Sequence, residues 1–197
     1  HCNLKCTMCW GYSSSRINAE RLDMVKKHGS TMPTWLFDMW YPSEYDIAKI
    51  DMMWHENPKF LDNFKKIAPT LKRLYVTGGE PSIIKANTDM INHLIEIGNK
   101  ECHVSFTTNL TTWNIDLYEK LSFFDKSEVQ VSIDGYKKSQ EYIRYGSAWE
   151  DIDRNFKKLI ELPDKVRIQI YNVFQVYNIF ESHKIMKWLD SLDLKRE

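Results

Sequence analysis

The chain has 197 residues, 27 basic and 27 acidic side chains, and a formal net charge of zero. Its length favours one domain, and a composition of 43% hydrophobic and 27% charged residues argues against disorder. The charge balance argues against a strong overall attraction to nucleic acid or acidic membranes, and the lack of any run of about 18 apolar residues argues against a membrane span.

Three of the four cysteines lie at the very start of the chain. Cys2, Cys6 and Cys9 share one short loop, and Cys102 lies far away in an apolar segment. A secreted disulfide framework spreads its cysteines along the chain, so this clustering favours a metal site in a reducing compartment. We therefore expect a cytoplasmic protein, in which Cys102 is a buried and unreactive thiol.

The spacing of the three cysteines favours an iron–sulfur cluster over zinc. Zinc ligands usually come as two separated pairs, although a zinc site made of the three thiolates with His1 or another histidine stays open. A 4Fe-4S cluster normally has four thiolate ligands, so three would leave one iron able to bind a substrate or cofactor. Lys5, between the ligands, is expected to reduce the anionic charge of such a cluster.

Residues 10–71 are irregular and rich in Trp, Met and Pro, with weak helical patterns at 19–28 and 59–68. The large apolar side chains of this stretch are expected to form a helical cap, with the lining of a substrate channel as the alternative. These side chains are Trp35, Phe37, Met39, Trp40, Met52, Met53 and Trp54.

A regular alternation begins after Pro69. Strands are predicted at 72–77, 101–108, 128–133 and 165–176, and helices at 87–98, 114–121, 138–144, 148–162 and 179–192. Strands that alternate with helices indicate an α/β fold with a parallel sheet, wound into a barrel or an open doubly wound sheet.

Polar residues or glycines follow each predicted strand. They are Gly78-Gly79-Glu80, Thr108-Asn109, Ser132-Ile133-Asp134-Gly135 and the stretch 175–178. Function in parallel α/β folds lies beyond the carboxyl ends of the strands, so these segments are the candidate site.

Several motifs resemble those of the radical S-adenosylmethionine (SAM) superfamily. Residues 1–9, HCNLKCTMC, resemble its CxxxCxxC cluster loop, and Gly78-Gly79-Glu80-Pro81 resembles its GGE motif. A later segment resembles members that carry SPASM or twitch C-terminal domains. It comprises Ser132-Ile133-Asp134-Gly135, Glu141-Tyr142-Ile143-Arg144 and Gly146.

The resemblance implies a partial (β/α)6 TIM-like barrel with a 4Fe-4S cluster held by Cys2, Cys6 and Cys9. It implies that SAM chelates the fourth iron and is cleaved reductively to a 5′-deoxyadenosyl radical, which abstracts hydrogen from a substrate. A peptide substrate is suggested by the SPASM-like segment, and an electron donor such as flavodoxin or ferredoxin is implied as partner. No substrate acid or base is identified in the sequence.

The resemblance also assigns contacts to SAM. Gly78 and Gly79 would let the backbone approach the ligand, and Glu80 would accept from the methionyl amino group. The alternative for these residues is a turn that ends a strand and carries a solvated Glu.

Arg144, with Ser132, is expected to bind the SAM carboxylate, and Asn109 the ribose or methionyl part. An exposed helical Arg and a turn-forming Asn are the alternatives. Phe174 or Val176 is expected to contact adenine.

The chain departs from the family pattern at Met8, where an aromatic residue is frequent, and at Gln140, where many relatives carry His. Residues 1–197 are expected to be a fragment of a radical SAM core domain, with the first strand and a C-terminal part outside it. Two other functions stay open: a non-enzymatic zinc or iron–sulfur module, and a catalytically silent relative that binds SAM.

Overall fold

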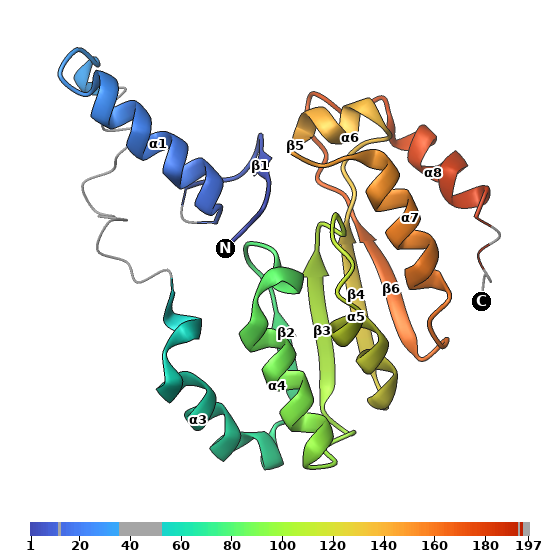
Figure 1. The fold of residues 1–197 in the computed structure, drawn as a ribbon. Coiled ribbons are helices and arrows are strands. Elements are labelled where there is room, and N and C mark those ends of the chain that lie inside the picture. Colours follow the sequence, from blue (N-terminus) through green and yellow to red (C-terminus); the bar gives the residue numbers. More distant parts are fainter. Residues whose placement is uncertain (12, 36–52, 193, 195–197) are drawn as a thin grey trace.

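The computed structural model of the chain describes residues 1–11, 13–35, 53–192 and 194. Its centre is a parallel sheet of β2 (Arg73–Val76), β3 (His103–Thr108), β4 (Ser127–Ser132) and β6 (Val166–Tyr171), in that spatial order (Figure 1). This arrangement confirms the predicted class, an α/β fold of the partial TIM-like type. The described strands do not close into a barrel.

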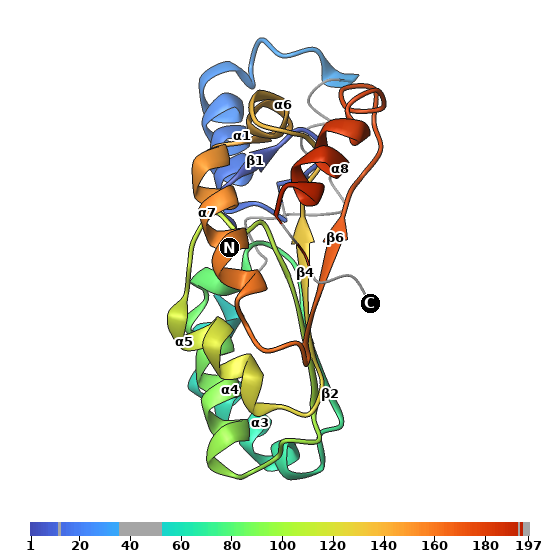
Figure 2. The ribbon, with the colours of Figure 1, turned by 90° about the vertical axis from the view of Figure 1, so that its right-hand side faces the viewer.

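One face of the sheet is covered by helices. Helices α4 (Lys85–Glu96), α5 (Ile115–Tyr118) and α7 (Trp149–Ile160) lie on this face, as Figure 2 shows from the side. The strands contribute Val104, Phe106, Val129 and Val131 to the core beneath these helices, all essentially inaccessible to solvent. These residues occupy alternate positions because side chains in a strand point to opposite faces in turn.

The intervening strand residues are polar. Tyr75, Ser105, Thr107, Glu128 and Gln130 alternate with the core residues of β2, β3 and β4. Gln130 Oε1 accepts hydrogen bonds from Thr107 Oγ1 at 2.8 Å and from Tyr75 Oη at 3.3 Å. The sheet is therefore amphipathic, with an apolar helix-covered face and a polar opposite face.

The amino-terminal segment lies at the carboxyl end of the sheet. Its short strand β1 (Lys5–Cys6) pairs antiparallel with β5 (Arg144–Tyr145), and α1 (Ser15–His28) follows (Figure 1). Helix α6 (Lys138–Ile143) leads directly into β5. The small sheet thus holds the cysteine loop beside the turn that follows β4.

The other described elements complete the connections. They are the 3-10 helices η2 (Trp54–Glu56), η3 (Ala68–Thr70), η4 (Pro81–Ile83) and η5 (Glu119–Phe123), and the α-helices α3 (Pro58–Ile67) and α8 (Ser182–Asp190). Helix α8 is attached to α7 through Trp188, whose ring packs against Trp149 and Phe156 at centroid distances of 5.0 and 4.9 Å.

All predicted strands and helices form, with shifted ends. Strand β6 ends at Tyr171 and not at residue 176, because Asn172 and Val173 bond to the turn after β4. Helix α8 starts at Ser182 and not at 179, because hydrogen-bonded turns occupy 175–181. The strands β1 and β5, two residues each, were not predicted.

Of the aromatic and methionine residues expected to form a cap or channel, Phe37, Met39, Trp40 and Met52 lie outside the described residues. Trp35 is 68% exposed. None of the described helices has the length and apolar character that crossing a bilayer requires.

Candidate functional site

The start of the chain lies directly against the Gly78-Gly79-Glu80 turn after β2. The amide of Glu80 donates to the carbonyl oxygen of His1 at 2.7 Å. A Cβ atom on Gly79, where φ is +49°, would lie 1.8 Å from this same carbonyl oxygen. Only glycine fits this close approach without a shift of the chain, so the glycine at 79 places Cys2 beside the sheet.

Side chains from two other elements fix the cysteine loop. Asn3 donates from Nδ2 to Thr111 Oγ1 at 2.8 Å and accepts at Oδ1 from Asn109 Nδ2 at 2.9 Å. Ser14, the buried N-cap of α1, donates to the Leu4 carbonyl oxygen at 2.6 Å, and Ser15 donates to that of Cys2 at 3.2 Å. These contacts were not predicted, because serines before a helix and an asparagine in a loop are common for local reasons, such as capping a helix, and do not indicate a distant partner.

The structure brings the three predicted ligand cysteines together. Cys2 and Cys6 are buried with Leu4, and Met8 and Cys9 pack against them. A hydrogen bond from the Cys6 thiol lowers the pKa of Cys9 to about 6, against the effect of burial. The same bond, followed by burial, raises the pKa of Cys6, and burial raises that of Cys2. Thiols that lie this close together can supply the thiolate ligands that an iron–sulfur centre requires.

The cation beside the thiols is Arg144, and not Lys5. Arg144 Nη1 lies 4.0 Å from Cys6 Sγ, and its Nε donates to Asp134 Oδ2 at 2.7 Å. Lys5 instead pairs with Glu20 at 3.2 Å and lies over the ring of Tyr145. The expectation that Lys5 reduces the charge at the site was therefore wrong, because the β1–β5 pairing turns Lys5 toward α1 and Tyr145.

Glu80 is completely buried, and its carboxylate accepts hydrogen bonds from residues around the site. Its Oε1 accepts from the amide of Ser82 at 3.0 Å and from Thr108 Oγ1 at 2.8 Å, and its Oε2 accepts from the amide of Asn109 at 2.7 Å. A carboxylate has about four acceptor positions. Three of them are occupied, and the two bonds from Thr108 and Asn109 join the end of β2 to the end of β3, so the solvated-Glu alternative does not describe this residue.

Asn109 forms a turn and also reaches the cysteine loop. Its Oδ1 accepts from the amide and hydroxyl of Thr111, an Asx-type turn, while its Nδ2 bonds to Asn3. Ser132, at the end of β4, is 8% exposed, and its carbonyl oxygen accepts from Gln140 Nε2 at 3.3 Å. Both predicted SAM contacts therefore lie at strand ends that face the amino-terminal segment.

Gln140, at the position where many relatives carry His, ties the turn after β4 to α6. Its Oε1 accepts from the amides of Asp134 and Gly135 at 2.8 and 3.0 Å. Asn178 Nδ2 donates to the carbonyl oxygens of Asp134 and Val173, each at 2.7 Å. Asp134 is therefore the junction of three segments, which are the turn after β4, α6 and the loop after β6.

The residues predicted to contact adenine lie in the loop after β6. Phe174 is 67% exposed and Val176 is 82% exposed, so both are accessible at the carboxyl end of the sheet. In the same loop, Gln175 Oε1 accepts from Thr7 Oγ1 of the cysteine loop at 3.5 Å. Among the described residues, its buried Nε2 has no hydrogen-bond partner.

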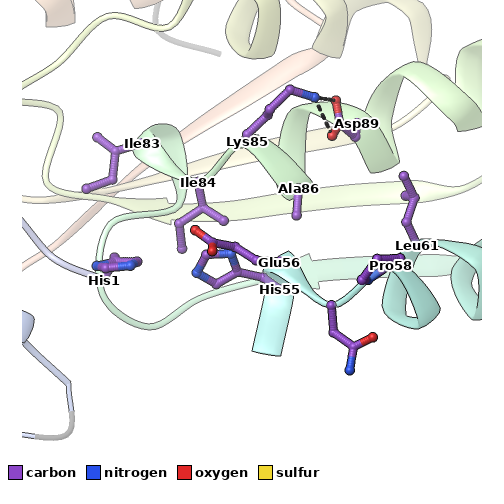
Figure 3. Close-up of a pocket in the computed structure, with 11 residues that line it drawn as sticks. His1, His55, Glu56, Pro58, Leu61, Ile83, Ile84, Lys85, Ala86 and Asp89 are labelled. Atoms are coloured by element: carbon purple, nitrogen blue, oxygen red, sulfur yellow. Dashed lines mark hydrogen bonds and ion pairs between the residues drawn. The ribbon is translucent and has the colours of Figure 1, made fainter. Parts of the chain in front are cut away.

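A hollow of about 660 Å³ lies beside the site, between the start of α3 and the start of α4 (Figure 3). Its described lining includes His1, His55 and Glu56 on one side and the ion pair of Lys85 with Asp89 on the other. Cys2, Cys6 and Cys9, the predicted ligands, are not among its lining residues, so the hollow is distinct from the thiol cluster.

Cys2, Cys6 and Cys9 are three buried or half-buried thiols, and the Arg144 guanidinium lies beside Cys6. Thiolates are the usual ligands of iron–sulfur clusters, in which they bind different iron atoms. Within the described parts of the chain, no three His, Cys, Asp or Glu side chains form a group that could hold a single metal ion.

Two comparisons with known proteins bear on this site. A search of curated proteins gives no match. A family model, the Radical SAM superfamily, matches residues 1–189, which include the cysteine loop, the Gly-Gly-Glu turn and all four strands of the parallel sheet. Members of this family generally use a 4Fe-4S cluster and SAM. The match spans nearly the whole chain, and the chain therefore belongs to the radical SAM superfamily.

Proposed function

We propose that the protein is a radical SAM enzyme whose 4Fe-4S cluster is held by Cys2, Cys6 and Cys9. The single observation that carries this proposal is the packing of these thiols beside the turn at Gly79, at the carboxyl end of a parallel sheet. When bound, the cluster and SAM supply a 5′-deoxyadenosyl radical that removes a hydrogen atom from a substrate.

The chain's own residues would orient the cofactor. The backbone at Gly78 has a φ of +83°. No atom lies within 4 Å of the position that a Cβ atom would occupy there, which leaves room for SAM to approach the turn. The remaining acceptor position of Glu80 would take the methionyl ammonium group. Arg144, Ser132 and Asn109 would bind the carboxylate and the ribose, and Phe174 or Val176 would cover adenine.

The reaction needs an electron and a protected substrate. We place the protein in the cytoplasm with a flavodoxin or ferredoxin as the electron donor, since thiolate ligands and a reduced cluster need a reducing compartment. A peptide is the proposed substrate class, on the resemblance of residues 132–146 to SPASM-type members.

Anaerobic reconstitution with iron and sulfide tests the proposal. Wild-type protein should gain iron and sulfide equal to one 4Fe-4S cluster per chain, and should release 5′-deoxyadenosine from SAM when dithionite is added. Cys6→Ala should lose both properties. Cys102→Ala is the matched control, because this buried cysteine lies immediately before β3, at the end of the sheet away from the cysteine loop.

Two outcomes would contradict the proposal. Stoichiometric zinc without iron would make the protein a metal-binding module. A complete cluster that binds SAM but releases no 5′-deoxyadenosine would make it a catalytically silent relative.

A further inference from the structure

The buried carboxylate of Asp134 has no role in the function proposed above. Its side chain is completely inaccessible to solvent, and both oxygens accept hydrogen bonds. Oδ1 accepts from the amide of Val173 at 2.8 Å, and Oδ2 accepts from Arg144 Nε at 2.7 Å. Burial of an ion pair costs desolvation energy, so its presence points to a reason other than stability alone.

The partner of this carboxylate faces a cluster ligand. Arg144 pairs with Cys6 in the register of β1 and β5, and its Nη1 lies 4.0 Å from the Cys6 sulfur. The Arg144 side chain is only 13% exposed. A guanidinium has five N–H donors. Asp134 takes the Nε donor and Nη1 faces the sulfur, so the outer donors stay available for the SAM carboxylate.

The backbone of Asp134 is held by side chains of other segments. Gln140 Oε1 accepts from the Asp134 amide, and Asn178 Nδ2 donates to the Asp134 carbonyl oxygen. These two side chains come from α6 and from the loop after β6, so two other segments fix the position of Asp134. An arginine side chain loses rotamer freedom when it is fixed, and an acceptor already in place at Nε offsets part of this cost.

We propose that Asp134 is a positioning residue for the iron–sulfur centre, which holds the Arg144 guanidinium against the Cys6 sulfur and so raises the reduction potential of the cluster. This inference rests on the proposed function. Net charge and hydrogen bonds to the sulfurs set the potential of such clusters. A fixed cation stabilises the reduced form, which carries more negative charge, over the oxidised form.

The competing explanation is that Asp134 only neutralises Arg144, and it predicts the opposite effect of Asp134→Asn. If Asp134 only neutralises Arg144, its loss leaves the site more positive and raises the reduction potential. If Asp134 positions Arg144, its loss releases the guanidinium from Cys6 and lowers the reduction potential. An asparagine at position 134 has one side-chain oxygen, whereas two groups, the Val173 amide and Arg144 Nε, donate to the carboxylate. The Val173 amide is fixed and Arg144 can rotate, so the Asn NH₂ group should face Arg144 and displace it.

The test compares midpoint potentials of reconstituted wild type, Asp134→Asn and Arg144→Met, followed by electron paramagnetic resonance. We expect Asp134→Asn to shift the potential in the negative direction, and Arg144→Met to shift it in the same direction. In the Arg144→Met background, Asp134→Asn should no longer lower it. Glu101→Gln breaks the exposed pair with Lys72 at the amino ends of the strands and should cause no shift.

A second readout needs no cluster. In metal-free wild type, the Arg144 Nε–H should give a ¹⁵N–¹H signal that exchanges slowly with water, and Asp134→Asn should abolish this signal while the circular dichroism spectrum stays native. A wild type that forms no cluster would overturn the proposed function. A wild type with a normal cluster, and an Asp134→Asn potential that rises or stays unchanged, would overturn this inference alone.

Discussion

Gly79 joins the cysteine loop to the sheet through a contact that no side chain can replace. We expect Gly79→Ala to displace residues 1–9, because the added Cβ would lie 1.8 Å from the His1 carbonyl oxygen. Iron content after reconstitution should fall to a small fraction of wild type, while the far-ultraviolet circular dichroism spectrum stays native. Full iron content in this variant would contradict the close approach.

Gly98→Ala is the matched control for this experiment. Gly98 also has a positive φ, +73°, but no atom lies within 4 Å of a built Cβ. The substitution should cost ~1 kcal/mol of backbone strain and leave the iron content unchanged.

Glu80 has a structural role that precedes any ligand. In Glu80→Gln, the amide group must face either the Ser82 or the Asn109 backbone N–H, because the carboxylate accepts from both. We expect the free energy of unfolding of the metal-free protein to fall by about 1–3 kcal/mol in urea titrations. Glu96→Gln, at a largely exposed position, should change it little. If Glu80→Gln lost SAM binding but kept the wild-type stability, Glu80 would contact the ligand without a structural role.

At the scale of elements, the turn between β4 and α6 depends on Gln140. This side chain is completely buried and bonds to two amides and to the Ser132 carbonyl oxygen. Gln140→Leu keeps the volume and leaves two N–H groups without acceptors. It should lower the unfolding free energy by ~1–3 kcal/mol. Gln169→Leu, on β6, serves as the comparison, and an equal loss there would argue against a specific role of the turn.

The elements with strong local patterns were predictable from the sequence. Alternating and β-branched residues mark β2, β3 and β4, and amphipathic spacing marks α4 and α7. The end of β6 was not predictable, because Val173 leaves the strand to bond to the Asp134 side chain, a contact 39 residues away. Strands β1 and β5 are too short to leave any periodicity.

The segments that form the candidate site could be predicted from the sequence, but the contacts that hold them together could not. The cysteine spacing and the Gly-Gly-Glu turn are local features of the sequence. The link from Asp134 through Arg144 to Cys6 joins three segments, and it depends on the β1–β5 register, which only the fold reveals. Lys5 was mistaken for the cation of the site for the same reason.

At the scale of the whole molecule, the cysteine loop and the parallel sheet differ in how they are held. The loop depends on a two-residue strand pair and a few side-chain bonds, whereas β3 and β4 lie inside the main core. We expect removal of iron to speed amide exchange in residues 1–9 and 144–145 and to leave β3 and β4 unchanged. A local loss of ~1.4 kcal/mol corresponds to about tenfold faster exchange. Uniform acceleration across the sheet would contradict this division.

The alternation of polar and apolar side chains in β4 restricts which mutations this strand tolerates. Glu128 and Gln130 alternate with Val129 and Val131 in a strand that is buried on both sides. Loss of a single codon here would invert the strand, sending carboxylate and amide groups under α7 and valines to the polar face. A substitution in β4 changes one side chain, whereas a lost codon moves all the following ones to the opposite face. The exposed turn at Asp164 can lose or gain a codon at much smaller cost.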